Sequence, residues 1–276
     1  MKRSLSIILL ILLTVGLLLP TAIASENDMV ITYGETTYNN QDYKNIVDTY
    51  FSTEASIHEA MVKVITAAEV NEVSAGITHK TYGSDQIFSS ALLDLSESDE
   101  LVVDVDTTKI TVITAKMYFS ALESAGITQG HVVVTSPVPS TGESALAGVM
   151  NCYEDATGVE IPEEVKEVAN EEIQTESQII ENNNISSNEL SDVVEEVKEE
   201  VKKNDMTQPE EVKEVINEVT NNYNIELNVD DIDNLANVIS KEQSLQGSAE
   251  QVGEQLENSI GESQSFIDKI LSFFGF

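Results

Sequence analysis

Arginine is almost absent from this sequence, because Arg3 is the only one in 276 residues. Acidic side chains outnumber basic ones by 49 to 14, and the formal net charge is −35. Nucleic acid binding needs positive charge to displace counterions from phosphates, so this composition excludes nucleic acid as a partner. The charged partners that the composition allows are cations, and we expect a weak, diffuse association with divalent cations.

Cysteine and tryptophan are equally scarce, with one cysteine, Cys152, and no tryptophan. A single cysteine excludes an intrachain disulfide, so the fold must be stabilised by a packed core. The length allows one substantial domain with additions or two small domains. No spacing typical of a cofactor site or a metal site is present, and we expect no cofactor.

Long hydrophobic runs are limited to the N-terminus, where residues 5–19 are nearly all apolar. Lys2 and Arg3 precede the run, Pro20 follows it, and residues 22–24 read Ala-Ile-Ala. This order is typical of a secretory signal peptide, and the run is short for a membrane span. We therefore predict a signal peptide over residues 1–24 and an exported protein, extracellular or associated with the cell envelope. An uncleaved anchor is the alternative.

The segment from residue 25 to residue 158 alternates strand-like and helix-like patterns, which predicts an α+β domain with a mixed sheet. The strands are expected at residues 30–33, 61–65, 90–95, 101–114 and 131–135. Residues 61–65 are apolar on both faces, as in a buried central strand. An acidic turn joins the third and fourth strands. Thr114 is a candidate helix cap, and Gly126 suits a left-handed helix end. We expect this segment to fold without the rest.

The remainder of the chain contains no strand patterns, and residues 159–262 form an acidic, mostly helical region. Five amphipathic segments are expected, of which the second begins at a capping box of Ser186 and Glu189. Thr207 is the predicted cap of the third and Asp230 that of the fourth, and the fifth is expected to start at Ser248. Residues 263–276 are predicted to continue from it as a short apolar amphipathic C-terminal helix.

The first half resembles a family of secreted proteins known as domain of unknown function 1002. The resemblance rests on ITVITAKMY at residues 110–118, ALESAGI at 121–127, VVVTSPVPSTG at 132–142 and ALAG at 145–148. VITYG at residues 30–34 also fits. It covers roughly residues 29–158 and implies an exported envelope or extracellular protein of a kind common in Gram-positive bacteria. It implies no catalytic residues.

The loop at residues 136–144 is the best candidate binding site in the sequence. It joins a strand to a helix N-terminus, a geometry that can present backbone N–H groups to an anion. The weak candidate binding residues are Ser136, Thr141, Gly142 and Ser144. The motif lacks the second glycine of a nucleophile elbow and the lysine of a phosphate loop. A rigid turn with a Ser or Thr cap is the alternative interpretation.

The other candidate groups are interpreted as structural. The three histidines, His58, His79 and His131, are widely separated, and Cys152 lies on an amphipathic helix where a buried thiol is expected. Residues 228–233 cluster oxygen side chains without the pattern of a calcium loop, so a helix cap and a solvated face are expected. Asn184 fits an N-glycosylation acceptor. We predict no catalytic residues and no metal site.

The C-terminal helix is the candidate contact with a membrane surface or a protein partner. Its large apolar residues are Phe266, Ile267, Ile270, Leu271, Phe273 and Phe274. A helix of this length is too short to span a bilayer but can lie in its interface. The sequence thus favours a non-catalytic exported protein that acts through protein or surface contacts. A secreted hydrolase with a site near residues 136–144 is the alternative.

Overall fold

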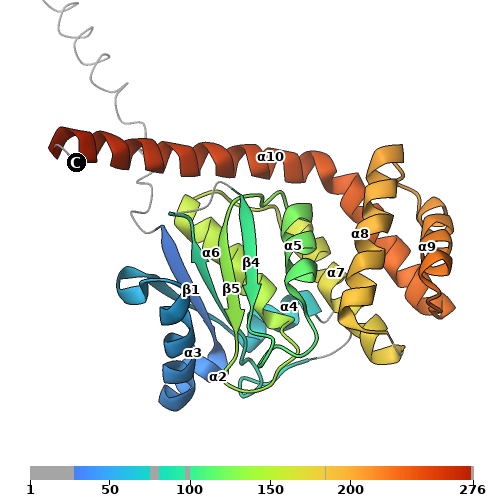
Figure 1. The fold of residues 1–276 in the computed structure, drawn as a ribbon, viewed down its shortest axis with the longest axis horizontal. Coiled ribbons are helices and arrows are strands. Elements are labelled where there is room, and N and C mark those ends of the chain that lie inside the picture. The colour runs from blue at the N-terminus through green and yellow to red at the C-terminus, as the bar shows by residue number, and fades with distance from the viewer. Residues whose placement is uncertain (1–27, 75–80, 97–99, 184, 275–276) are drawn as a thin grey trace, which may run out of the picture.

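The computed structural model describes residues 28–74, 81–96, 100–183 and 185–274, and the side chains of these residues except 73, 74 and 262–274. A five-stranded sheet with helices on both faces is followed by a helical end, as Figure 1 shows. The α+β class predicted from the sequence is confirmed. The strands are β1 (Met29–Gly34), β2 (Met61–Ile65), β3 (Ser90–Asp94), β4 (Leu101–Val105) and β5 (Gly130–Thr135).

The sheet is mixed, with the strand order β2-β1-β3-β5-β4. The two outer pairs, β1 with β2 and β4 with β5, are parallel, whereas β3 runs antiparallel to both of its neighbours. The central strand β3 is buried along its whole length. Side chains alternate between the two faces along each strand, so the sheet buries apolar residues on both faces.

One face of the sheet is covered by α5 (Ala115–Ser124) and α6 (Ser144–Thr157), and the other by α3 (Gln41–Glu54). Leu93 and Val132 contribute to the core under α5 and α6. Leu92 and Val133, their neighbours along the strands, pack with Val47 and Phe51 of α3. The short segments α2 (Glu35–Asn39), η1 (Ile57–Glu59) and α4 (Ala67–Ser74) connect the N-terminal strands.

A second core lies in the helical end of the molecule. It is formed by parts of α7 (Glu163–Asn182), α8 (Ser187–Asn204), α9 (Pro209–Tyr223) and α10 (Val229–Phe274). Valines at helical spacing supply much of it, because α8 and α9 each bury one apolar stripe. The buried residues of α8 and α9 in this core are Leu190, Val193, Val194, Val197, Val201, Val212, Val215, Ile216 and Val219.

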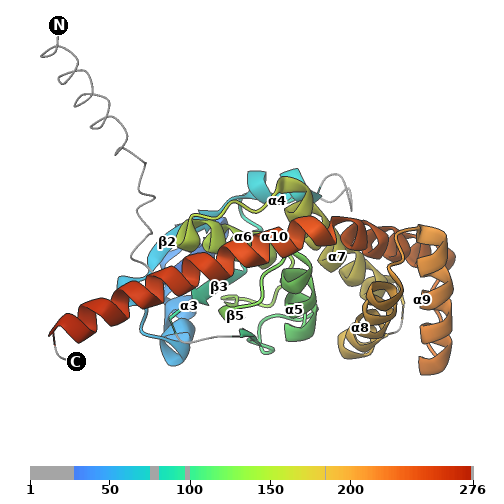
Figure 2. The same cartoon turned by 90° about the horizontal axis from the view of Figure 1, so that it is seen from above.

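Two long helices, α7 and α10, contribute to both cores. The N-terminal half of α7 packs into the core of the sheet and its Ile179 into the helical core. Conversely, α10 begins in the helical core and then runs across the sheet part (Figures 1 and 2). It passes so close to Gly126 (φ +82°) that a Cβ there would lie 1.9 Å from the carbonyl oxygen of Ala249. Gly126 therefore permits both the turn after α5 and the helix contact.

The strands differ from the sequence-based expectation in two respects. β2 is an edge strand rather than a central one, and Val62 is 46% exposed there. β4, which pairs with β5, ends at Val105 instead of continuing to residue 114. Local hydrophobicity identifies a strand but not its partner, which depends on the order in which the helices cross the sheet.

The helix ends were predicted well where a side-chain cap is local. Thr114 caps α5, and Ser186 and Glu189 form the capping box of α8. The cap predicted for α9 was wrong, because the cap position is Gln208, followed by a proline in the first turn. The start at Ser248 was also wrong, since α10 is one helix from Val229 to Phe274, and residues 263–274 continue it.

Independent folding of residues 25–158 is not expected from this architecture. The helices after residue 158 add seven buried side chains to the core of the sheet, namely Ile161, Val165, Ala169, Ile173, Val252, Leu256 and Ile260. Burying one large aliphatic side chain stabilises a fold by about 1.5–3 kcal/mol. The combined contribution of these side chains is comparable with the whole free energy of unfolding of a domain, roughly 5–15 kcal/mol.

We therefore predict that a chain of residues 25–158 unfolds without cooperativity. Differential scanning calorimetry should show a broad, weak transition for this fragment and a sharp one for the mature chain. A single sharp transition of the fragment near the melting temperature of the mature chain would show that the later helices are dispensable for this core.

Candidate functional site

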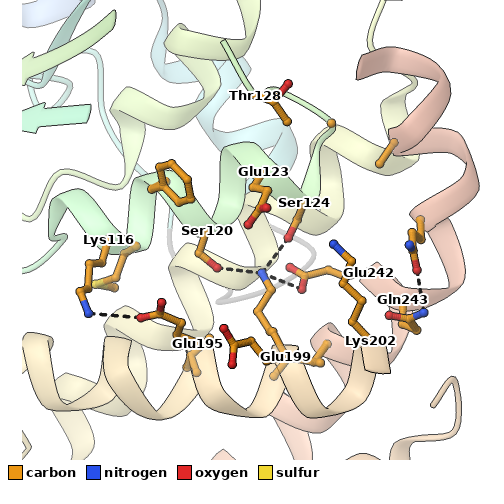
Figure 3. A pocket seen from close by; sticks show the side chains of 18 of the residues that line it. Lys116, Ser120, Glu123, Ser124, Thr128, Glu195, Glu199, Lys202, Glu242 and Gln243 are labelled. Carbon is orange, nitrogen blue, oxygen red and sulfur yellow. Dashed lines mark hydrogen bonds and ion pairs between the residues drawn. The ribbon is translucent and has the colours of Figure 1, made fainter. Parts of the chain in front are cut away.

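The principal cavity lies between α5, α8 and α10 and has a volume of about 820 Å³ (Figure 3). Its wall combines apolar side chains, such as Met117, Phe119 and Val194, with polar ones from all three helices. This volume is in the range of small-molecule or side-chain binding sites. The cavity is formed at the junction of the two cores, where α8 and α10 leave the helical end and meet α5.

A single ammonium group, that of Lys198 on α8, organises the floor of the cavity. Its Nζ donates to Oγ of Ser120 (2.8 Å) and Oγ of Ser124 (2.7 Å), and to Oε1 of Glu172 (2.7 Å). Ser120 and Ser124 lie one turn apart on α5, so both face the lysine. An ammonium group has three hydrogen-bond donors, and these contacts use all three.

Two further carboxylates reach the same floor, those of Glu176 on α7 and Glu242 on α10. Oε2 of Glu242 lies 3.1 Å from Nζ of Lys198, which gives an ion pair without a hydrogen bond. Neither oxygen of Glu176 or Glu242 accepts a hydrogen bond from the described residues, although Glu176 is 1% exposed and Glu242 8%. Burying a carboxylate without donors is costly.

The electrostatics of the floor are therefore unbalanced, with three carboxylates facing one ammonium. Burial, followed by the charge of Glu172, raises the pKa of both Glu176 and Glu242 well above the ordinary value, although Lys198 opposes the shift. Glu172 lies within hydrogen-bond reach of either group once that group is protonated. Burial alone would lower the pKa of Lys198, but Glu172 and Glu242 together raise it.

The mouth of the cavity is acidic as well. The exposed glutamates of its lining are Glu123, Glu195, Glu199, Glu250, Glu254 and Glu257, and they outnumber the lysines at the mouth, Lys116 and Lys202. At one end Lys116 forms ion pairs with Asp192 and Glu195 of α8, and Figure 3 shows the pair with Glu195. The Phe119 ring is 42% exposed at the wall. The arrangement can accept hydrogen bonds from a positively charged group and provides apolar surface beside it.

The candidate binding residues predicted from the sequence lie outside this cavity. The hydroxyl of Ser136 is buried and has no hydrogen-bond partner among the described residues. The Thr141 carbonyl accepts from the amide of Ile113. Gly142 (φ +108°) packs against Tyr118, whose hydroxyl donates to its carbonyl oxygen (2.5 Å), and Ser144 is the first residue of α6.

The histidines and the cysteine occupy separate places. Nε2 of His131 lies 2.8 Å from Oδ2 of Asp104 on the neighbouring strand. His58 lies in η1, and His79 falls outside the described residues. The thiol of Cys152 is buried beside the Thr32 hydroxyl (2.8 Å), and burial raises its pKa to about 12. The thiolate is therefore disfavoured.

The acidic cluster at residues 228–233 forms the start of α10. Oδ1 of Asn228 accepts from the amide of Asp231, so Asn228 rather than Asp230 caps the helix. The side chains of Asn183 and Asn228 donate to Asp231, and Asp233 pairs with Lys213. Within the part of the chain that the structure describes, no three acidic, histidine or cysteine side chains are arranged to hold a metal ion.

Two sequence-based expectations fall outside the described part of the chain. The side chains of Phe266, Ile267, Ile270, Leu271, Phe273 and Phe274 lie beyond the last described side chain, and Asn184 is not described. The backbone of α10 is described to Phe274.

Sequence reasoning missed the floor of the cavity, although a signal was available. Glu172 and Glu176 are adjacent to the apolar stripe that contains Val165, Ala169 and Ile173, so they fall on the buried side of α7. A glutamate at a core position requires a partner, and Lys198 was one of three lysines in an apparently solvated helix. The spacing reveals the buried acids, but the partner comes from another helix.

The buried acids make the stability of the protein depend on pH. Because the pKa of Glu176 is raised in the folded state, the folded chain retains a proton that the unfolded chain releases above about pH 4.5. Stability is therefore lost as the pH rises towards the folded-state pKa. We predict that Glu176→Gln, which mimics the protonated side chain, removes this loss. The gain over wild type should grow by on the order of 1 kcal/mol per pH unit.

Urea unfolding of both proteins between about pH 5 and pH 8 measures this difference. Glu218→Gln is the matched control, because it makes the same charge change at an exposed position on α9. If the free energies of unfolding of wild type and Glu176→Gln changed in parallel with pH, the folded protein would not retain a proton on Glu176.

Comparison with known proteins identifies the family. Residues 33–259 match the family described as "Protein of unknown function (DUF1002)", so the match extends beyond residue 158 into the helices. "Uncharacterized protein YpuA" of Bacillus subtilis (strain 168) is 30% identical over 156 residues, 56% of this chain and 52% of that relative. The chain thus spans about half the length of that relative. No solved structure matches. The resemblance seen in the sequence is confirmed, and the protein belongs to the DUF1002 family of unknown function.

Proposed function

We propose that this protein is exported and acts outside the cytoplasm as a non-catalytic binding protein, through protein or surface contacts. The observation that carries the proposal is the cavity between α5, α8 and α10, where Glu176 and Glu242 are buried without hydrogen-bond donors. Such groups are expected where a ligand completes the hydrogen bonds. The export pattern of residues 1–24 supports the location.

The chemistry of the reactive groups favours binding over covalent catalysis. The ammonium form of Lys198 is stabilised by its carboxylate partners, so the lysine has no free lone pair for attack on a carbonyl. The buried thiol of Cys152 has a raised pKa, so it is disfavoured as a nucleophile. Each group is thus held in its unreactive form.

The C-terminal end of α10 is the second proposed contact, with a membrane surface or a partner. The helix has 46 residues, which corresponds to about 70 Å at ~1.5 Å per residue. Its last turns extend past the body of the molecule in both views (Figures 1 and 2). Among the described helices, none is both long and apolar enough to cross a membrane. A contact within the interface of a bilayer fits the apolar sequence of this end.

Export and contact through the cavity can be tested together in the native host. We expect mass spectrometry to find a mature N-terminus near Ser25 or Glu26 in the extracytoplasmic fraction. A photo-crosslinking amino acid in place of Phe119, which is 42% exposed at the cavity, should give a specific adduct. The same amino acid in place of Tyr223, 40% exposed on α9, is the control.

Two results would contradict the proposal. An intact leader on protein recovered only from the cytoplasm would overturn export. Equal adducts from the two positions, or none from the position of Phe119, would remove the cavity as the contact site.

The role of the end of α10 is tested by a chain that stops at Glu262. We expect the mature protein to float with liposomes and the shortened chain to remain at the bottom of the gradient, because six large apolar residues are removed. Because the proposed contact of this end is with the membrane and not with the protein's own core, the melting temperatures of the two chains should be similar. Unchanged flotation with a melting temperature lowered by several degrees would show that this end packs on the protein itself.

A further inference from the structure

The missing hydrogen-bond donors at the floor of the cavity define the chemistry of its ligand. The three donors of Lys198 are used by Ser120, Ser124 and Glu172. Four oxygens of Glu176 and Glu242 are left without donors among the described residues, and both side chains line the cavity. A ligand that binds there must supply hydrogen-bond donors, and a positively charged donor would take the place of the protons that these carboxyl groups hold in the free protein.

The other charged ligands fit this floor less well. An anion would meet the buried carboxylates and the acidic mouth, which repel it. A bare metal ion would compete with the ammonium of Lys198, which already lies among the oxygens of Ser120, Ser124 and Glu172. The cavity of about 820 Å³ is also much larger than an ion requires, and part of its wall is apolar. An organic cation with an apolar stem fits both features.

The mouth favours a cation that belongs to a peptide. The exposed glutamates around it come from α5, α8 and α10, for example Glu123, Glu199 and Glu254, so negative charge extends well beyond the floor. Additional basic residues of a peptide would pair with these glutamates, while a single small cation would leave them unused. The exposed ring of Phe119 provides a surface on which a guanidinium group or an aliphatic stem packs.

We infer that the cavity between α5, α8 and α10 binds a basic segment of a partner protein, with one arginine or lysine side chain inserted between Glu176 and Glu242. This inference rests on the proposed binding function and specifies the partner's chemistry. The inserted cation supplies the donors that Lys198 does not, and the stem lies against Phe119. The flanking basic residues face the glutamates of the mouth.

The test uses the mature protein and a short fluorescein-labelled peptide with one central arginine flanked by leucine and lysine, followed by fluorescence anisotropy. A second peptide carries citrulline, the neutral isostere, in place of the arginine. We expect the citrulline peptide to bind about tenfold more weakly, because charged hydrogen bonds to buried carboxylates are lost. The variant Glu176→Gln/Glu242→Gln should bind both peptides equally weakly, which is the coupling expected for a direct contact.

The controls separate the floor from general charge attraction. Glu218→Gln should bind like wild type, since this exposed residue lies on α9 outside the cavity. Phe119→Ala should weaken binding of the arginine peptide several-fold, and circular dichroism verifies that each variant folds. If the double variant does not fold, the affinities of the arginine and citrulline peptides for wild type and for Phe119→Ala still test whether an arginine is inserted.

Equal binding of the arginine and citrulline peptides to wild type would overturn the inference. Spermidine or Ca²⁺ that binds to wild type but not to the double variant, without being displaced by the peptide, would overturn the peptide assignment. The proposed function fails separately, since it requires an adduct at the position of Phe119 in the native host. If the adduct forms but the arginine and citrulline peptides bind equally, the protein acts through the cavity on a ligand of different chemistry.

Discussion

The ammonium group of Lys198 is the constraint on which the helical half of the structure depends. It is the cation among three carboxylates contributed by α7 and α10, and its hydrogen bonds also hold two serines of α5. An ammonium has only three donors, however, so it stabilises Glu172 and leaves Glu176 and Glu242 incompletely satisfied. Removing one partner from such a buried network leaves uncompensated charge, which typically costs about 3–5 kcal/mol. The same contacts therefore join four helices and create an acceptor site.

The position of this network follows from the way that the two cores are connected. α7 and α10 each pack into both cores, and α8, which belongs to the helical core, also contacts α5. Close packing at the crossing is possible because Gly126 and Gly253 bring the backbones of the α5 turn and α10 together. Both glycines also line the cavity, which therefore lies directly beside this contact. The connection between the two cores and the position of the cavity thus both depend on the passage of α10 across the sheet.

The sequence predicted features that depend on neighbouring residues and missed those that depend on distant ones. The caps at Thr114 and Ser186 were correct because each cap bonds to an amide three residues away. The edge position of β2 was missed, because it is not encoded in the strand itself. The candidate site was missed for the same reason. The spacing on α7 places Glu176 on the buried side of its helix, but Lys198 looks like an ordinary charged residue of a solvated helix until the fold brings α7 and α8 together.

The described part of the chain does not supply enough hydrogen-bond donors for its buried carboxylates, so a proton or a ligand must. Infrared spectroscopy of the ligand-free protein tests it directly, at a pH where exposed glutamates are fully ionised. The account predicts a carbonyl band of a protonated carboxyl group in the wild type that is lost in Glu176→Gln/Glu242→Gln and retained in Glu218→Gln. A wild-type spectrum with ionised carboxylates alone would contradict it, because the network would then be satisfied by the protein itself.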